Sequence, residues 1–308
     1  DYPAFFDLIN LSLPENRNGI ISRLADERLI IVTAITGKWT ITNLGAILFA
    51  KKLKQFRHLE RKSVRVILYQ GNSRLETIKE FELNKGYASG FAGLIEFINS
   101  QLPHNEVIGT ALRKNVLMYP ELAVRELVSN AIIHQDLTIT GAAPMIEIFA
   151  NRLEITNPGA PIVDVIRFLD TPPCSRNELM AAFMRRIGIC EERGSGIDKV
   201  VSQTELYQLP APLFTAIDDN TKVALFAHKE FKDMDTDEKI RACYLHCCLN
   251  YVNHESMNNA SLRKRFALGE ENSASISRLI KLSFEKNLIK AYDDNANRKS
   301  LRYIPFWA

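Results

Sequence analysis

A carboxylate and a carboxamide stand four residues apart in a segment whose apolar periodicity predicts an α-helix. They are Glu126 and Asn130, and His134 follows four residues later. Side chains spaced i, i+4 share one face of a helix, so all three are expected on the same face. An amide oxygen can ligate Mg²⁺, and a neighbouring carboxylate can orient or deprotonate an attacking water. The spacing is compatible with metal-assisted phosphate chemistry and also with a plain solvated helix face.

Two glycine-containing turns further along the chain complete this pattern. Asn157-Pro158-Gly159 follows a predicted strand and lets the backbone turn sharply, so that a base can approach it. Gly194-Ser195-Gly196 precedes a predicted helix that opens at Ile197, and the amides and dipole of a helix start suit phosphate. Each turn alone is a common structural turn. The order of all three segments predicts a site for a nucleoside triphosphate and one metal ion.

The elements that must position these residues fall into three blocks. We expect an N-terminal α/β unit over residues 1–105, a nucleotide-binding unit over 106–231 and a C-terminal unit over 235–308. The helix that carries Glu126 should start near Pro120, because proline is tolerated in a first helical turn. Residues 145–149 and 152–155 predict a hairpin, because only two residues link them. The remaining predictions for the middle unit are helices over 164–169 and 176–187, and strands over 210–214 and 222–227.

Composition and charge set broad limits on the function. The chain has 308 residues, a formal net charge of +3 and 46% hydrophobic residues, which suits two or three domains with their own cores. The charge is nearly balanced, so contact with nucleic acid must be argued from local clusters. One such cluster, residues 51–65, predicts an amphipathic helix whose basic face is a plain solvated surface or a contact for phosphate. Five cysteines without disulfide spacing indicate a reducing cytoplasm, and neither a membrane span nor a signal peptide is expected.

The C-terminal block predicts three helices and a two-stranded hairpin, which is the winged-helix plan. The expected helices cover 237–252, 259–266 and 273–286, and the hairpin joins 288–292 to 301–304. Short polar and basic residues at the start of a third helix suit the major groove, and a basic wing suits the backbone of double-stranded DNA. A protein–protein module has the same plan. The candidate DNA-binding residues are Ser275, Arg278 and Lys281 on the helix and Arg298 and Lys299 in the wing.

Residues from about 119 to about 228 resemble the GHKL ATPase fold, the family of gyrase, histidine kinases and MutL. The resemblance is carried by segments 125–136, 152–159, 175–177 and 191–197. It is closer to a divergent branch found in bacterial RecG-like transcriptional regulators, which typically carry an AlbA-like (Schlafen-type) DNA-binding domain before the region that corresponds to residue 1. The resemblance implies an α+β chain. Its centre would be an α/β sandwich, a mixed sheet with helices on one face, flanked by an N-terminal α/β segment and a C-terminal winged helix.

The resemblance also implies roles for the residues named above. Asn130 would bind Mg²⁺ and Glu126 would position water, with His134 beside them in the nucleotide site. Asn157 and Gly159 would form the turn that contacts adenine. The family's usual turn is Asp-x-Gly-x-Gly, and here an asparagine stands in place of the aspartate, a weaker acceptor than a carboxylate.

The remaining implied contacts concern the phosphates. Gly194, Ser195 and Gly196 would lie at the triphosphate of ATP. The segment 172–186 stands where the family has its ATP lid, and it is short and helical. Arg176 in this segment either reaches the phosphates or caps a local turn.

The sequence therefore predicts a cytoplasmic regulator that binds ATP with Mg²⁺, hydrolyses it weakly if at all, and contacts double-stranded DNA. A homodimer is expected, because helix-turn-helix regulators usually read two half-sites. Two alternatives are a DNA-stimulated ATPase that remodels its partner and a scaffold that has lost the nucleotide. The RecG label itself does not imply a helicase, because the Gly-x-x-x-x-Gly-Lys-Ser/Thr phosphate loop is missing from the sequence.

Overall fold

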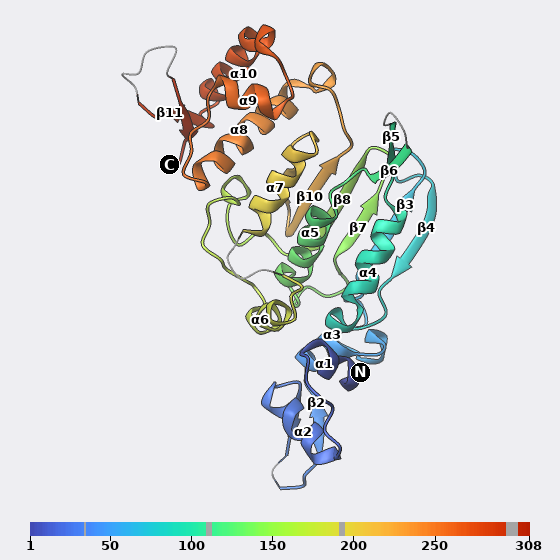
Figure 1. Ribbon diagram of the computed structural model, residues 1–308. Coiled ribbons are helices and arrows are strands. Elements are labelled where there is room, and N and C mark those ends of the chain that lie inside the picture. Colours follow the sequence, from blue (N-terminus) through green and yellow to red (C-terminus); the bar gives the residue numbers. More distant parts are fainter. Residues whose placement is uncertain (34, 109–112, 191–194, 294–300) are drawn as a thin grey trace.

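The computed structural model describes residues 1–33, 35–108, 113–190, 195–293 and 301–308, with the backbone alone for the described part of 104–117. The fold is α+β, as predicted, with ten α-helices and a mixed six-stranded sheet among the described residues. A small N-terminal unit lies at one end of the molecule and a C-terminal group of helices at the other (Figure 1). Within the described chain, no helix is both long and apolar enough to cross a membrane.

The central sheet has the strand order β4-β3-β7-β8-β10-β9. All neighbouring strands are antiparallel except β3 and β7, which run parallel. The predicted hairpin is confirmed, with Ile148 opposite Leu153. The strands are β3 (Arg65–Tyr69), β4 (Thr77–Glu82), β7 (Met145–Ile148), β8 (Arg152–Pro158), β9 (Leu213–Ile217) and β10 (Asn220–Phe226).

The sheet crosses the predicted domain limit at residue 105. Strands β3 and β4 come from the N-terminal block, yet β3 pairs with β7 of the middle block over residues 65–68 and 145–148. Strand β4 lies at the sheet edge and is mostly exposed, so it lacks the buried alternation that signals a strand in a sequence. The domain limits themselves remain a prediction.

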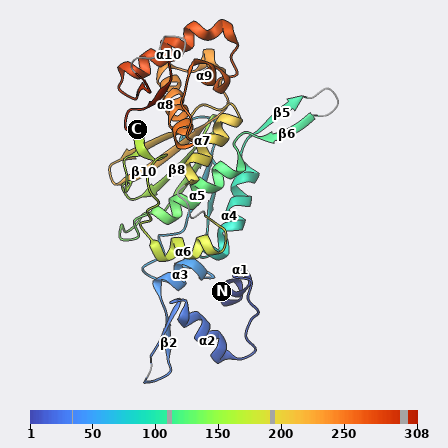
Figure 2. The same cartoon turned by 60° about the vertical axis from the view of Figure 1, so that its left-hand side comes forward.

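Three helices cover one face of this sheet (Figures 1 and 2): α4 (Tyr87–Gln101), α5 (Glu121–His134) and α7 (Gly196–Leu206). Helix α5 follows Pro120, as predicted, and buries an almost continuous set of apolar side chains between the sheet and α7. A hairpin of β5 (His104–Ile108) and β6 (Arg113–Leu117) projects away from the sheet (Figure 2). The predicted helices over 164–169 and 176–187 are shorter in the structure, as the 3₁₀ turn η2 (Val165–Arg167) and helix α6 (Glu178–Arg186).

The opposite face of the sheet carries a buried charge network. The carboxylate of Glu147, 1% exposed, accepts two hydrogen bonds from the guanidinium of Arg74 at 2.7 and 2.6 Å, and a third from the Tyr69 hydroxyl. Glu154 on the next strand pairs with Lys222 at 2.7 Å. A buried carboxylate is costly unless it is paired. The ion pairs and hydrogen bonds of this network therefore explain why polar residues are tolerated on this face of the sheet.

The N-terminal unit contains α1 (Tyr2–Leu8), α2 (Arg17–Asp26), β1 (Ile30–Val32), β2 (Trp39–Ile41) and α3 (Asn43–Phe49). The basic helix predicted for residues 51–65 is wrong. Apart from the 3₁₀ turn η1 (Leu53–Gln55), this segment forms turns and the start of β3. Lys62 is buried and its ammonium donates to the carbonyls of Ile139 at 2.5 Å and Ala142 at 3.3 Å. These bonds to a distant loop hold the segment in an irregular path that local periodicity cannot show.

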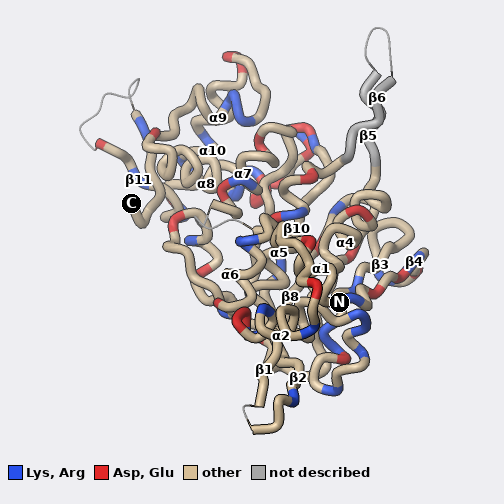
Figure 3. The backbone as a smooth tube through the Cα atoms, turned by 60° about the horizontal axis from the view of Figure 1, so that its bottom comes forward, with Lys and Arg blue, Asp and Glu red and all other residues tan. Residues whose placement is uncertain are grey.

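The C-terminal elements appear in the predicted order and close to the predicted limits. They are α8 (Thr236–Val252), α9 (Asn259–Arg265), α10 (Ser273–Glu285), β11 (Ile289–Ala291) and β12 (Tyr303–Pro305). Helix α8 starts with a capping box in which Asp235 and Glu238 bond each other's backbone amides. Lys, Arg, Asp and Glu are interspersed along most of the described chain rather than collected on one face (Figure 3), in line with the small net charge.

Candidate nucleotide-binding site

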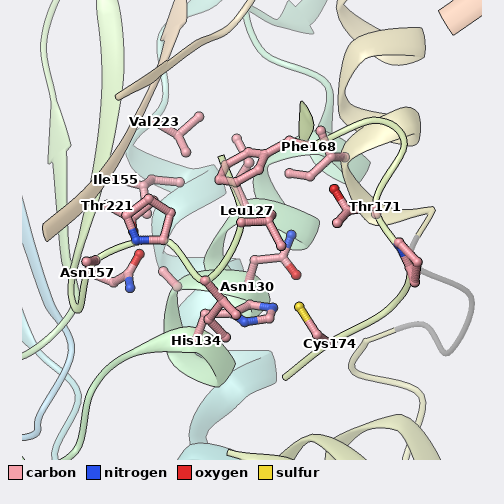
Figure 4. Close-up of a pocket in the computed structure, with 18 residues that line it drawn as sticks. Leu127, Asn130, His134, Ile155, Asn157, Phe168, Thr171, Cys174, Thr221 and Val223 are labelled. Carbon is pink, nitrogen blue, oxygen red and sulfur yellow. The ribbon is translucent and has the colours of Figure 1, made fainter. Parts of the chain in front are cut away.

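A cavity of about 160 Å³ opens between α5, strands β8 and β10, the start of α7 and the segment 160–174 (Figure 4). Its size is close to that of an engineered cavity of roughly 150 Å³ that accepts benzene, so it can hold an aromatic ring. Its walls are mainly apolar, as is usual for small-molecule sites. The apolar lining comes from Leu127, Ala131, Ile155, Ile162, Val163, Phe168, Ile197 and Val223.

Two of the three residues of the helix pattern lie along one side of this cavity, and the third borders a smaller cavity beside it. Asn130 and His134 line it, and both also line an adjoining cavity of about 50 Å³ that Glu126 borders. Glu126 is 3% exposed. Burial and the nearby Arg176 guanidinium lower the pKa of His134, so this imidazole is neutral at neutral pH. The spacing of four residues therefore does place these side chains on one face, and that face borders two cavities that share lining residues.

Gly196 brings the glycine turn at the start of α7 against the α5 residues Glu126 and Asn130. A Cβ added to Gly196 would lie 3.1 Å from Glu126 Oε2 and 3.5 Å from Asn130 Nδ2. The first residue of α7 therefore packs directly against the carboxylate and amide of α5, and both cavities include it in their lining. Ser195 is the N-cap residue of α7, whereas Gly194 lies outside the described residues.

Asn157 presents an unsatisfied polar group to the cavity. Its side chain is 6% exposed, and its Nδ2 atom is buried without a hydrogen-bond partner among the described residues. An unpaired buried donor costs about 1–3 kcal/mol, so it calls for an explanation. Because Asn157 also lines the cavity, a ligand with a polar edge would satisfy this group.

Gly159 closes the turn that follows Asn157. Its φ of +123° is open to glycine alone in practice, and a Cβ there would lie 3.0 Å from Asp136 N and 3.4 Å from His134 O. The Asp136 amide donates to Pro158 O at 2.6 Å. The glycine therefore allows the end of strand β8 to lie against the end of α5, which aligns the amide of Asn157 with the helix residues.

Arg176 holds this arrangement from the other side. Its Nε donates to His134 O at 3.1 Å, its Nη2 donates to Ala160 O at 2.5 Å, and its Nη1 lies 3.6 Å from Asp136 Oδ2. Asn177 Nδ2 donates to the carbonyls of Ile133 and Gln135. These bonds satisfy the last carbonyls of α5, which have no partner within the helix. The Arg176 bonds reach distant parts of the chain rather than a local turn, and Arg176 does not line either cavity.

Several residues of the site had no signal in the sequence. Arg185, at the end of α6, borders the smaller cavity beside Glu126, and Thr221, Thr171 and Cys174 border the larger one. Their positions depend on how α6, β10 and the segment before α6 pack on α5, which no local pattern reveals. Within the described chain, no group of three or more His, Cys, Asp or Glu side chains is placed to hold a metal ion. A metal bound beside Asn130 would therefore take further ligands from a nucleotide and from water.

The candidate DNA-binding residues follow the cavity-lining residues in the sequence and belong to the C-terminal elements. Ser275, Arg278 and Lys281 are exposed on α10. Lys281 lies 3.7 Å from the carboxylate of Glu285 on the same helix, an exposed pair that holds it only weakly. Arg298 and Lys299 lie outside the described residues.

Asp198, in the first turn of α7, gives the fold a pH dependence that can be measured. Its Oδ1 atom is buried without a partner among the described residues, and burial, with the nearby Asp170 carboxylate, raises the pKa of Asp198 to about 6. This raised pKa favours folding below pH 4, and the contribution is lost as the pH rises through 6. We expect Asp198→Asn to be more stable than the intact chain at pH 7 by about 1 kcal/mol, a value discounted because the carboxyl is half-buried.

Urea unfolding of both chains between pH 4 and pH 8 checks this expectation. The difference in unfolding free energy should grow as the pH rises from about 4 to about 6, where Asp198 is ionised in the unfolded chain but still protonated in the folded one, and it should stay constant above pH 6. A constant difference over the whole range would show that the ionisation of Asp198 has no part in it.

Over 92% of its length, the chain superposes on the crystal structure of the DIP2311 protein from Corynebacterium diphtheriae, with a TM-score of 0.57 and 15% sequence identity. This similarity shows a shared fold alone. The chain spans 56% of that protein. A search of curated proteins finds no match to this chain.

The family comparison is more specific. Residues 141–225 match the family described as "Putative ATP-dependent DNA helicase recG C-terminal". The chain therefore contains a divergent GHKL-like, RecG-like domain. The matched segment includes Asn157, Gly159 and Gly196, whereas Glu126 and Asn130 precede it. The place of these two residues in the site depends on their contact with Gly196.

Proposed function

We propose that the chain binds ATP together with Mg²⁺ in the cavity between α5, β8 and α7. The observation that carries this proposal is the buried Nδ2 of Asn157, which has no partner among the described residues and belongs to a side chain that lines a ring-sized apolar cavity. An adenine edge offers a donor and an acceptor side by side, and an asparagine amide can pair with both. The substitution of asparagine for the family's aspartate therefore preserves the ability to recognise adenine.

The phosphates would extend from the ring cavity toward Gly196. The start of α7 supplies a helix N-terminus, and the absence of a side chain at Gly196 allows this N-terminus to lie close to the side chains of Glu126 and Asn130. Asn130 would supply an oxygen ligand to Mg²⁺, and Glu126 would orient a water. Mg²⁺ would neutralise phosphate charge at this place. We assign weak hydrolysis at most, because the segment 172–186 is short.

Two elements that border the cavities also contact the C-terminal helices. Helix α7 starts at Gly196, and near its other end Glu205 lies 2.9 Å from His246 Nδ1 and 3.3 Å from Arg265 Nε. The second element is the segment around η2, where Phe168 lines the cavity and Ile166 O accepts a hydrogen bond from the Tyr244 hydroxyl. A change in either element on nucleotide binding would therefore be transmitted to α8 and α9.

We infer that these contacts couple nucleotide binding to contact with double-stranded DNA. In this proposal α8, α9 and α10 with the β11–β12 hairpin form a winged helix whose third helix enters the major groove. ATP with Mg²⁺ orders the segment 172–186 and thereby shifts the C-terminal helices between two arrangements. The chain would act as a cytoplasmic, homodimeric regulator of transcription.

The test is DNA binding with and without nucleotide, measured by fluorescence anisotropy on a short labelled duplex. We expect ATP with Mg²⁺ to change the affinity of the intact chain several-fold. The double variant Arg278→Ala, Lys281→Ala should weaken binding on all duplexes and reduce the slope of log K against log salt by about 2, because two phosphate contacts are lost. Lys239→Ala on α8, away from the proposed helix, serves as the matched control. Equal affinity in the intact chain and the double variant would contradict the proposal.

A second candidate function is a DNA-stimulated ATPase. The contact of Gly196 with Glu126 favours it, because that contact places a carboxylate beside the proposed phosphate position. This function requires multiple turnover of ATP that rises when DNA is added, whereas the proposed switch requires only binding. A scaffold without nucleotide would show no rise in melting temperature with ATP and Mg²⁺, because only a ligand that binds the folded state stabilises it.

A further inference from the structure

One exposed thiol borders the proposed nucleotide cavity. Cys174 lies in the segment before α6 and lines the cavity, and its sulfur lies across from Asn130 and His134 (Figure 4). It is the only exposed cysteine of the five, all of which lie in the described chain. A reagent from solution therefore reaches this thiol at the mouth of the site.

The other four cysteines are poorly placed to react. Burial raises the pKa of the Cys190 thiol to about 11 and that of Cys243 to about 12. Burial also raises the pKa of Cys247 and of Cys248, the latter to about 12. The thiolate is the reactive form of cysteine, so these groups react slowly near neutral pH. Exposure and geometry together favour reaction at Cys174.

The cavity that Cys174 borders carries a second, independent sign of a ligand, the buried Nδ2 of Asn157, for which the described part of the chain offers no partner. The cavity volume of about 160 Å³ suffices for one aromatic group. A group of that size attached to Cys174 and directed inward would occupy the space proposed for the adenine. Attachment at Cys174 and nucleotide binding would therefore exclude each other.

We propose that Cys174 is a modification site at which a small disulfide closes the nucleotide cavity. The inference rests on the proposed function, because the proposed function identifies the cavity as the ATP site. The Cys174 thiolate attacks one sulfur of the disulfide, the original S–S bond breaks, and a mixed disulfide forms on Cys174. The other half leaves as a thiolate, and the proton of Cys174 passes to solvent. The small disulfide is the oxidant, and a free thiol reverses the step.

The probe is 5,5′-dithiobis(2-nitrobenzoate), which releases a coloured thiolate for each cysteine that reacts. With the full chain we expect one fast equivalent, located at Cys174 by mass spectrometry. ATP with Mg²⁺ should slow this reaction at least tenfold. Calorimetry should show ATP binding to the unmodified chain, loss of binding after modification, and recovery after dithiothreitol.

Two variants separate the causes. After treatment with the probe, Cys174→Ser should keep the ATP affinity that it had before treatment, whereas Cys190→Ser should lose ATP binding as the intact chain does. ATP binding that survives full modification of Cys174 would overturn this inference and leave the proposed function standing. If the unmodified, folded chain gives no heat with ATP, the proposed function fails, and the inference with it.

Discussion

Replacing Gly196 with valine is expected to weaken the binding of ATP with Mg²⁺ at least a hundredfold. A Cβ at this position would lie 3.1 Å from Glu126 Oε2, which is tighter than most Cβ contacts, and 3.5 Å from Asn130 Nδ2, an ordinary contact distance. The two further methyl groups of valine would push these side chains from the positions proposed for Mg²⁺ and water. A misplacement of about 1 Å in a preorganised site can cost a hundredfold. Calorimetric titration of ATP with Mg²⁺ measures the loss.

Two further variants control for the effects of the substitution itself. Gly93 in helix α4 has no atom within 4 Å of an added Cβ, so Gly93→Val tests valine in an uncrowded helix and should bind ATP normally. Gly196→Ala adds a single carbon and should give an intermediate loss. Normal affinity of a folded Gly196→Val chain would show that the space between α7 and α5 is not part of the binding site.

Replacing Asn157 with leucine is expected to weaken ATP binding between tenfold and a hundredfold. The amide would lose hydrogen bonds to adenine worth about 1–3 kcal/mol, and every 1.4 kcal/mol changes an affinity about tenfold. The same substitution removes a buried donor that has no partner among the described residues, so the free chain should be at least as stable as before. A loss of binding without a loss of stability would therefore report on the ligand contact alone.

Affinity by calorimetry and stability by urea unfolding check this expectation together. Asn151→Leu, in the exposed turn between β7 and β8, is the matched control and should leave ATP affinity unchanged. Unchanged ATP affinity in Asn157→Leu would remove the adenine-recognition role from this residue.

The parts of the fold that local physics determines were predictable from the sequence. Helix α5 follows from the apolar spacing after Pro120, and the β7–β8 hairpin follows from two apolar runs joined by a short link. The C-terminal helices start at polar capping residues such as Asp235 and Asn258. In each of these cases the interaction that fixes the element lies within a few residues of it.

Long-range contacts account for what the sequence did not predict. The parallel pairing of β3 with β7 joins segments about eighty residues apart and depends on the whole sheet. The segment 51–65 has a helical apolar pattern, but the bonds of the Lys62 ammonium to distant carbonyls accompany an irregular path. Neither the pairing of β3 with β7 nor the bonds of Lys62 can be predicted from a local sequence pattern.

The candidate site shows the same division. The spacing of Glu126, Asn130 and His134 was visible in the sequence, because a helix places residues four apart on one face. Arg185 and Cys174 entered the site only through the packing of α6 and the segment before it on α5. The unpaired amide of Asn157 is likewise a property of its surroundings, since the sequence shows an ordinary turn.

The most direct test of the ATP site is calorimetric titration of ATP with Mg²⁺ into the intact chain and into Asn130→Ala. We predict measurable binding to the intact chain, at least tenfold weaker binding to the variant, and a smaller effect of the substitution when Mg²⁺ is left out. Asn130 lines both cavities beside Gly196, so no other single residue probes the metal and phosphate side of the site as directly. No binding to the folded intact chain, or equal binding to both chains, would contradict the proposed site.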